Sequence, residues 1–233
     1  MKIEILYSEI ANLFGDMANV RYMEKSLPKA EFIYTSINDK PKFISEKVSL
    51  VYMGPMSEHS QELVIDTLSK YTDEIKKAIS DGVNFLVTGN AMEVFGKYIE
   101  NEDGTKVKGL GIFDIYAKRD MMHRYNSIEL GTFNKMEIVG FKSTFTEVFG
   151  NAPKFLKMKR GYGNSKDSDI EGIKKNNFIA TTLLGPILIL NPHFTKYLFE
   201  QMGSKNKLLY EDEMIKAYNK RLEEFKDMKR SLD

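Results

Sequence analysis

Short apolar segments alternate with helical patterns over residues 3–98. Four of the segments are rich in β-branched or aromatic residues, a composition typical of strands. The predicted strands are Ile3 to Tyr7, Glu31 to Tyr34, Val48 to Met53 and Val83 to Val87. Apolar residues at helical spacing predict helices at Met17 to Lys25, Ser57 to Ser80 and Ala91 to Tyr98. Because strands and helices alternate, we expect parallel βαβ units.

The second half of the chain has a different pattern. Between Gly109 and Leu190 the dominant signal is repeated strand segments, notably Gly111 to Tyr116, Glu137 to Phe141 and Asn177 to Leu184. We therefore predict an α/β domain with a central, mainly parallel sheet flanked by helices and extended by mixed or antiparallel strands from the second half. The cleft is expected at the carboxyl end of the fourth strand.

The C-terminal stretch predicts a long amphipathic helix. Its apolar residues recur at helical spacing and are Leu208, Leu209, Met214, Ile215, Tyr218, Leu222, Phe225 and Met228. We accordingly divide the chain into a domain over residues 1–205 and a helical extension over residues 206–233, with the helix ending near Leu232. The apolar stripe packs on its own domain or, alternatively, docks a partner subunit.

Composition and charge narrow the class of protein. The chain has 233 residues, 42% of them hydrophobic, which is enough for a sizeable core. Lys and Arg total 34 against 33 for Asp and Glu, so we expect no nucleic-acid partner. No apolar run approaches the roughly 18 residues of a membrane helix, and Met1 to Glu4 opens a strand-like segment instead of a signal peptide. We therefore expect no membrane insertion and a cytoplasmic location.

Cysteine is absent, and this excludes disulfides, thiolate metal sites and cysteine nucleophiles. The three histidines, His59, His123 and His193, are scattered and lack the spacing of metal ligands. We therefore predict no metal site and no cofactor.

Five motifs carry a family resemblance. They are ANLFGDMAN (Ala11 to Asn19), LVTGNAMEVFG (Leu86 to Gly96), GLGIFD (Gly109 to Asp114), GYGN (Gly161 to Asn164) and LLGPIL (Leu183 to Leu188). In order, spacing and flanks they resemble class I glutamine amidotransferases of the cobyric acid synthase (CobB/CobQ-like) group, which includes the GatD subunits of lipid II isoglutaminyl synthases. The resemblance covers about residues 3–202.

The resemblance implies a reaction that this chain lacks the groups to perform. In the family, a nucleophile elbow presents a cysteine at the head of a helix, and a histidine from a later segment transfers the proton. The cysteine position is Gly89 here, and the histidine position is Leu184. Since both the covalent step and the proton shuttle are lost, we expect glutamine hydrolysis at background rate.

Other positions of the vestigial pocket also depart from the family pattern. The turn that supplies oxyanion donors corresponds to Gly54 and Pro55, and proline has no N–H to donate. A glutamine of the elbow helix aligns with Glu93. The arginine that holds the substrate carboxylate falls at His123 or Arg124, and the register between them stays open. The helix start at Asn90 and the side chain of Tyr162 are the remaining predicted pocket positions.

Four further residues have ordinary explanations. Strand alternation aims Thr88 away from the direction that Gly89 faces, and no base stands near it in the sequence, so a substitute threonine nucleophile is disfavoured. The same argument from missing bases applies to Thr181 and Thr182. Asp16 lies in the first motif, where a capping or Asx-turn role is the simplest interpretation.

Three functions remain open. The first is a non-catalytic amidotransferase-like subunit that acts as scaffold or regulator of a Mur-ligase-like synthetase, the partner that the resemblance implies, in cell-wall precursor amidation. The second is a sensor or carrier that binds a small anionic ligand through Arg124 and the helix start at Asn90. The third is an enzyme of the same family with a different reaction in the same cleft.

Overall fold

The first half of the chain builds a parallel sheet, as predicted. In the computed structural model, which describes residues 1–229, its strands are β1 (Lys2–Leu6), β2 (Glu31–Thr35), β3 (Leu50–Met53) and β4 (Asn84–Thr88). The strand β13 (Phe178–Thr181) pairs in parallel with β4, which gives the order β2-β1-β3-β4-β13. Every residue of β3, β4 and β13 is buried, as expected for parallel strands covered on both faces.

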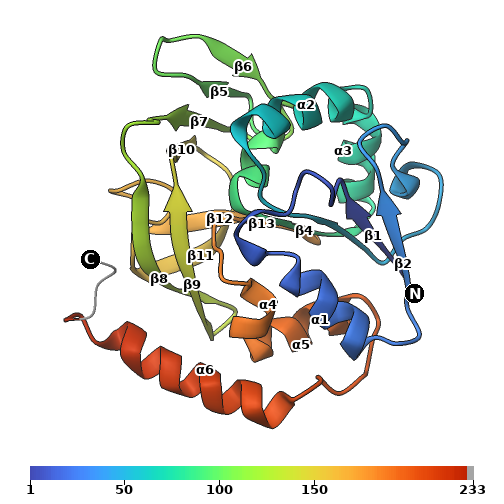
Figure 1. Cartoon of the computed structure of the whole chain (residues 1–233), viewed down its shortest axis with the longest axis vertical. Coiled ribbons are helices and arrows are strands. Elements are labelled where there is room, and N and C mark those ends of the chain that lie inside the picture. Colours follow the sequence, from blue (N-terminus) through green and yellow to red (C-terminus); the bar gives the residue numbers. More distant parts are fainter. Residues whose placement is uncertain (230–233) are drawn as a thin grey trace.

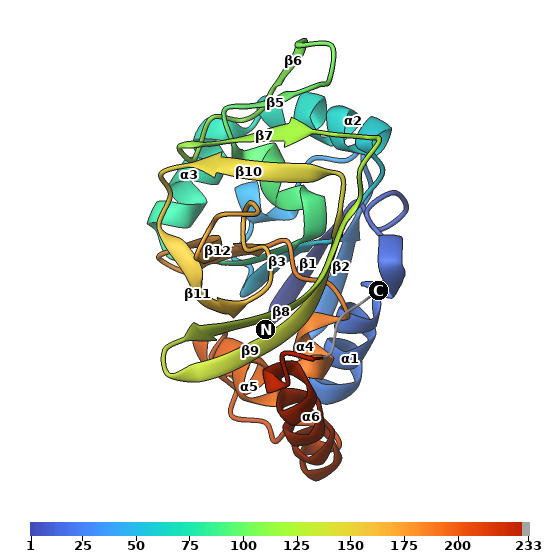
Figure 2. The same ribbon diagram turned by 90° about the vertical axis from the view of Figure 1, so that its left-hand side faces the viewer.

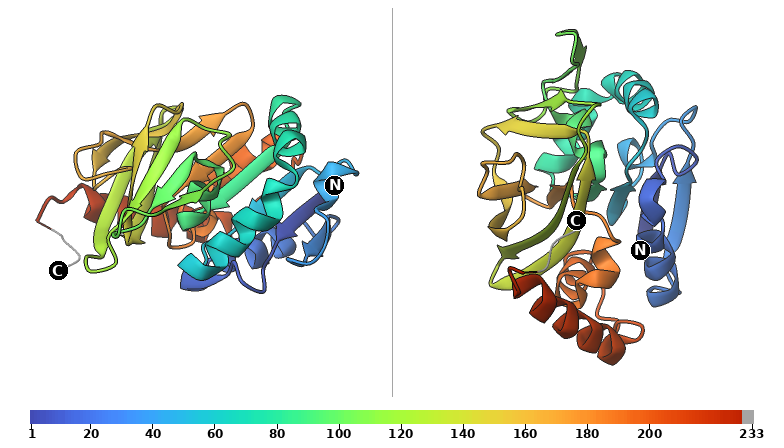
Figure 3. Two further views of the ribbon diagram at one scale, coloured as in Figure 1. Left: turned by 90° about the horizontal axis from the view of Figure 1, so that it is seen from above. Right: turned by 60° about the vertical axis from the view of Figure 1, so that its left-hand side comes forward.

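Four antiparallel strands from the second half extend this sheet. They are β12 (Ile170–Lys175), β11 (Lys154–Arg160), β8 (Tyr125–Phe133) and β9 (Met136–Thr144). They continue the order from β13 as β12-β11-β8-β9, so the whole sheet has nine strands and is mixed. The β8–β9 turn consists of Asn134 and Lys135, both with positive φ, which is the geometry that a two-residue hairpin requires. Figure 3 shows the parallel and antiparallel halves on opposite sides of the molecule.

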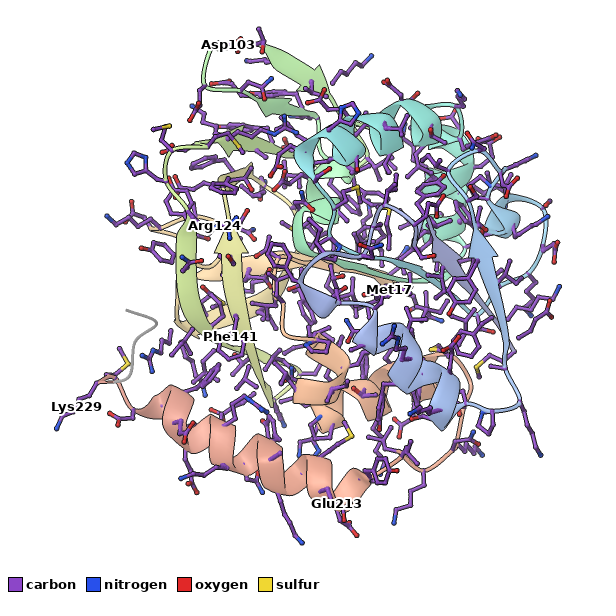
Figure 4. All side chains as sticks on the ribbon, in the orientation of Figure 1. Met17, Asp103, Arg124, Phe141, Glu213 and Lys229 are labelled. Carbon is purple, nitrogen blue, oxygen red and sulfur yellow. The ribbon has the colours of Figure 1, made fainter. Side chains whose placement is uncertain are left out.

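A second, four-stranded sheet crosses above the antiparallel half (Figure 2). Its strands are β5 (Tyr98–Glu100), β6 (Lys106–Lys108), β7 (Ile115–Arg119) and β10 (Thr146–Gly150), in the order β10-β7-β5-β6. The β5–β6 hairpin projects from the body, with Asp103 at its tip (Figure 4).

Helices cover both faces of the parallel strands (Figure 1). One face carries α2 (Glu58–Ser69) and α3 (Thr72–Ser80), and the other carries α1 (Ala18–Ser26), α4 (Ile187–Leu190) and α5 (Pro192–Gln201). Alternate residues of β3 belong to the hydrophobic cores on the two faces of the sheet. Val51 and Met53 pack in the core under α2 and α3, and Leu50 and Tyr52 pack in the core under α1 and α5.

The C-terminal helix α6 (Glu211–Lys226) packs on its own domain. Met214, Tyr218 and Phe225 are buried, and the Tyr218 hydroxyl donates to the Glu137 carbonyl at 2.8 Å. The buried stripe thus contacts β8, β9 and α5. This is the first of the two alternatives for the helix, in which its apolar stripe packs on its own domain. The predicted continuation towards Leu232 includes residues 230–232, which lie outside the described residues.

Three predicted elements were wrong in detail. The helix predicted over Ser57 to Ser80 is two helices, because the backbone leaves the helical region at Tyr71 (φ −126°, ψ 21°) and restarts. The helix predicted over Ala91 to Tyr98 is a 3₁₀ segment, η3 (Gly89–Phe95), which stops at the extended Gly96 and leads into β5. Of the strand predicted over Gly111 to Tyr116 only the last two residues belong to a strand, since Gly111 has φ +63° and residues 111–114 form a loop. Two further 3₁₀ turns are η1 (Leu13–Gly15) and η2 (Lys42–Ile44).

Candidate functional site

A sharp bend joins β4 to η3 at Gly89. Gly89 has φ +62°, a region that side chains other than glycine rarely adopt, and it is buried. A Cβ atom placed on it would lie 2.5 Å from Cβ of Pro55 and 3.3 Å from its Cα. The backbone therefore has the strand-to-helix bend of a nucleophile elbow, while a proline ring occupies the space of the side chain that an elbow presents.

The turn after β3 offers few backbone donors to a ligand. Pro55 has no N–H, and its carbonyl accepts from the Leu13 N–H at 3.1 Å. The next N–H, of Met56, donates to Oδ1 of Asn90 at 3.0 Å, and Nδ2 of Asn90 donates back to the Met56 carbonyl at 2.8 Å. Both polar atoms of the Asn90 side chain are thus engaged with Met56, and the helix η3 is a single short 3₁₀ segment. An anion-binding role for Asn90 has no support in this geometry.

Leu184 stands across the cavity from the bend. An isolated antiparallel bridge fixes its backbone: Leu184 N–H donates to the Phe141 carbonyl at 2.8 Å, and Phe141 N–H donates back at 3.2 Å. Leu184 is buried and lines the same cavity as Gly89 and Pro55. Two hydrocarbon side chains, of Pro55 and Leu184, therefore lie at the places where the family resemblance implies a thiol and an imidazole.

The cavity between these elements has a volume of about 120 Å³. Residues from six separate segments line it: Leu13, Phe14, Pro55, Met56, Ser57, Glu58, Gln61, Gly89, Asn90, Glu93, Arg124, Ser143, Thr144, Phe145, Thr146, Thr182 and Leu184. The structure thus brings together six of the predicted positions, namely Pro55, Gly89, Asn90, Glu93, Arg124 and Leu184. Figure 4 marks Arg124 at the start of β8.

Three predicted positions do not line the cavity. Gly54 lies below it, where an added Cβ would meet the Ala11 carbonyl oxygen at 2.7 Å. His123 is exposed, and its ring Nδ1 lies 2.8 Å from the Asp120 carboxylate. The Tyr162 ring packs edge-on against Tyr125 with 5.9 Å between centroids. Of the two candidates for the carboxylate-holding arginine, Arg124 is therefore the one at the cavity.

Arg124 owes its position to the register of the β8–β9 hairpin. Tyr125 pairs with Thr144, so the residue before β8 lies opposite the residue after β9. The Arg124 guanidinium carbon consequently sits 4.4 Å from the centroid of the Phe145 ring, a cation–π contact. Arg124 forms no hydrogen bond or ion pair with other residues of the range 1–229 within the usual distances, and its side chain is exposed.

Glu93 is a buried carboxylate at the cavity. Its two oxygens accept hydrogen bonds from the Thr146 hydroxyl and, at 2.9 Å, from Nε2 of Gln61. Burial raises the pKa of Glu93 above the usual carboxyl value, and these donors and the charges of Arg119 and Lys142 oppose the rise. Oε1 of Gln61 in turn accepts from Arg119 at 2.8 Å, and Arg119 also donates to Glu62 at 2.9 Å.

A buried network under the bend was not foreseen from the sequence. Asp16, expected to act as a cap, is 1% exposed and accepts hydrogen bonds from the Tyr52 hydroxyl, from Thr88 Oγ1 at 2.5 Å and from Asn19 Nδ2 at 3.0 Å. Burial raises the pKa of Asp16 to about 6, against these hydrogen bonds. Thr88 points to Asp16 and away from the cavity, as strand alternation predicted, so its hydroxyl serves the network.

A second set of buried charges lies behind the cavity. Lys142 is 2% exposed, and its ammonium donates to the Gly163 carbonyl. Burial lowers the pKa of Lys142, while Glu129, Glu171 and Glu93 act against that shift. Glu171 accepts from the Thr182 N–H at 2.6 Å, and burial raises its pKa to about 7. The sequence signal for this set is charged residues at inward positions of β8, β9 and β12.

In the part of the chain that the structure describes, no group of three or more His, Cys, Asp or Glu side chains is arranged to bind a metal ion. Within residues 1–229 no helix has the length and apolar character needed to cross a membrane.

Comparisons with known proteins agree with these motifs. A model of the CobB/CobQ-like glutamine amidotransferase domain matches residues 2–189. The chain is 29% identical over 212 residues to the GatD subunit of lipid II isoglutaminyl synthase (glutamine-hydrolyzing) from Staphylococcus aureus (strain N315), which covers 89% of this chain and 86% of that protein.

Two solved structures share the fold. A glutamine amidotransferase from Thermotoga maritima is similar with a TM-score of 0.53 at 12% identity, over 97% of this chain and 93% of that one. The glutaminase domain of Trypanosoma brucei CTPS is similar with a TM-score of 0.54 at 8% identity, over 90% of this chain and 96% of that one.

We expect Gly89→Ala to reduce the free energy of unfolding by about 3 kcal/mol, because a left-handed non-glycine residue and an overpacked contact each cost roughly 1–2 kcal/mol. Pro55→Gly removes the ring that the new methyl group meets. In a double-mutant cycle measured by chemical denaturation, Pro55→Gly should therefore recover at least about 1 kcal/mol of the Gly89→Ala loss. Additive effects of the two substitutions would contradict the contact.

The pKa of Asp16 also predicts a pH dependence of stability. Its folded-state pKa of about 6 exceeds the ordinary value of 3.8, so the folded protein binds the proton more tightly. Stability from this group is therefore full below about pH 4 and declines by about 3 kcal/mol as the pH rises through 6. We expect Asp16→Asn to flatten the unfolding free energy between pH 4 and 6, while Asp39→Asn on an exposed turn leaves the slope unchanged. Equal slopes for Asp16→Asn and the parent protein would refute this account.

Proposed function

The chain belongs to the CobB/CobQ-like glutamine amidotransferase family, and from that premise we propose that it is a member without glutaminase activity that serves as a scaffold or regulator of a Mur-ligase-like synthetase. The reaction to which such a pair contributes is amidation of a cell-wall precursor. The pathway part of the proposal draws on the similarity to the GatD subunit of a lipid II isoglutaminyl synthase.

The main support for the loss of glutaminase activity is the packing of Pro55 against Gly89. A nucleophile needs a side chain at the bend, and any Cβ there would lie 2.5 Å from the proline ring. A proton carrier needs a titratable group opposite, and Leu184 has none. Loss of the nucleophile alone leaves a vacant elbow, whereas here a neighbouring ring has taken the vacant space. Return of the missing thiol would therefore require a second change, at Pro55.

Exposed apolar side chains around the cavity support a partner at this face. Phe14, which lines the cavity, is 50% exposed and is held at φ +58°, a strained conformation for an aromatic residue. Leu13 beside it is 37% exposed, and Met122, two residues before Arg124, is 82% exposed. Apolar groups presented in this way are typical of protein–protein contacts.

The proposal is tested by measuring which compound supplies the amide nitrogen to the complex. The chain is co-expressed with the Mur-ligase-like synthetase of the same cell, and amidation is followed with ¹⁵N-ammonium or with glutamine labelled at the amide. We expect the complex to use ammonium and to incorporate no label from glutamine, because the chain releases no ammonia. Glutamine-dependent amidation would overturn the inactivity, and failure to co-purify any synthetase would overturn the scaffold role.

A matched pair of variants controls for the docking face in the same co-purification experiment. The test variant, Phe14→Asp, places a charge at the cavity rim. The control variant, Tyr34→Asp, places the same charge on β2, away from the cavity, where Tyr34 is 49% exposed. Only the first should reduce recovery of the synthetase.

A further inference from the structure

The strand β6 leaves one edge of the second sheet open. It is the last strand in the order β10-β7-β5-β6, at the free end of the sheet (Figure 2). In its hairpin, the Asn101 N–H donates to the Thr105 carbonyl at 2.8 Å, so these residues form a hydrogen-bonded pair. Because such pairs alternate along an antiparallel ladder, the N–H and C=O groups of Lys106 and Lys108 point away from β5. These backbone groups have no hydrogen-bond partner among residues 1–229, so they are available to an added strand.

The hairpin that carries β6 is fixed to the body of the molecule. Arg119 on β7 is 9% exposed, and its guanidinium donates to Oδ1 of Asn101 and to Glu62 of α2, both at 2.9 Å. Nδ2 of Asn101 donates in turn to the Thr105 hydroxyl at 3.0 Å. The side chain of Val107, on the inner face of β6, packs against the core under α2 and α3. The edge is therefore ordered before a partner arrives, which lowers the entropy cost of binding.

Lysine side chains give this edge a positive charge. On the outer face, Lys106 and Lys118 share one carboxylate, that of Glu100, at 3.3 and 3.6 Å. Lys108 is exposed and forms no ion pair with another residue of the range 1–229. The Lys106 ammonium lies 4.3 Å from the centroid of the Tyr98 ring, a cation–π contact that fixes it on this face. The excess of positive charge at β6 favours an acidic partner.

The two acidic residues of the hairpin tip are engaged within the molecule. Glu102 accepts from the Met121 N–H at 2.7 Å, and Asp103 accepts from the N–H of Thr105 at 2.9 Å and from its hydroxyl. Both carboxylates therefore hold the turn and the neighbouring loop, and neither pairs with a lysine of β6.

We propose that β6 is a docking edge for an extended acidic segment of a protein partner, which adds to the second sheet as an antiparallel strand. The side chains of Lys106 and Lys108 lie on one face of β6 and that of Val107 on the other. Two acidic residues separated by one apolar residue would match this pattern. Each acidic residue would also exchange two backbone hydrogen bonds with the lysine opposite it.

A second copy of this chain is a poor occupant of the edge. Pairing of β6 with β6 of another copy would place lysines opposite lysines, which is destabilising. The other edge strands of the two sheets are β2, β9 and β10, and none of them contains an apolar residue between two acidic residues. The segment therefore belongs to a different protein.

This inference goes beyond the scaffold role and does not depend on it. No residue of β6 lines the cavity beside Gly89, so the edge and the cavity are separate places on the molecule. The edge is tested on the chain alone, without a synthetase, so the two proposals can fail separately.

Nuclear magnetic resonance of the whole chain tests the inference. The probe is a cyclic β-hairpin peptide whose free strand carries glutamate, valine and glutamate in succession. One control peptide has lysines in place of both glutamates. A second control has both glutamates N-methylated, which keeps the charge and removes the N–H donors.

We expect the glutamate probe to bind with a Kd on the order of 1 mM at about 0.15 M salt and to shift the amide signals of Lys106 and Lys108. Both control peptides should bind at least about tenfold more weakly, because one repels the lysines and the other cannot complete the ladder. Equal binding by either control, or no binding by the glutamate probe, would overturn the proposal.

A charge reversal assigns the edge. In a variant with both Lys106→Glu and Lys108→Glu the preference should invert, so that the lysine peptide binds at least about tenfold more tightly than the glutamate probe. Lys220→Glu on α6, where the side chain is 72% exposed, should keep the preference of the parent chain. Both lysines of β6 are exposed, so the double variant should fold normally, and its amide spectrum verifies this. A double variant that still prefers the glutamate probe would contradict the assignment.

Discussion

The contact between Pro55 and Gly89 is the constraint on which the rest of the site depends. The bend after β4 keeps φ +62°, so the backbone route of an elbow is retained, yet the proline ring stands where a side chain would leave the backbone. Pro55 has no N–H, so the turn that faces the bend lacks a backbone donor at that position. The N–H of its neighbour Met56 is hydrogen-bonded to Asn90. Pro55, Met56, Gly89 and Asn90 thus form one packed unit that fills the space beside the bend and engages the Asn90 side chain at the start of η3.

Around that unit the fold preserves a cavity with its own polar chemistry. Arg124 is held by the hairpin register and by Phe145, and Glu93 by Thr146 and Gln61. Below the bend, Asp16 is tied to Tyr52 and Thr88 and anchors the strand that leads to Gly89. The parallel sheet therefore presents a structured cavity at the carboxyl ends of its strands, and neither a thiol nor an imidazole lines it.

Sequence patterns predicted the parallel strands, the family and the place of the bend, because those depend on local spacing and on motifs that are contiguous in the chain. The predictions failed where contacts between residues far apart in the chain determine the ends of an element or the residues that reach the cavity. The 3₁₀ segment at Gly89–Phe95 ends where the extended Gly96 leads into β5, and the break at Tyr71 divides the predicted helix into two helices that pack on the same core. Tyr162 and His123 could not be excluded from the cavity by sequence, since only the hairpin register selects Arg124. The buried roles of Asp16 and Lys142 likewise need partners far away in the chain.

Loss of glutamine hydrolysis is the central claim, and the most direct measurement is ammonia release by the unmodified chain. Purified protein is incubated with glutamine labelled with ¹⁵N at the amide, and free ¹⁵N-ammonium is followed by NMR at high enzyme concentration. The account predicts a rate equal to that of buffer, since neither a thiol nor an imidazole faces the cavity. A rate that rises in proportion to protein concentration would contradict it.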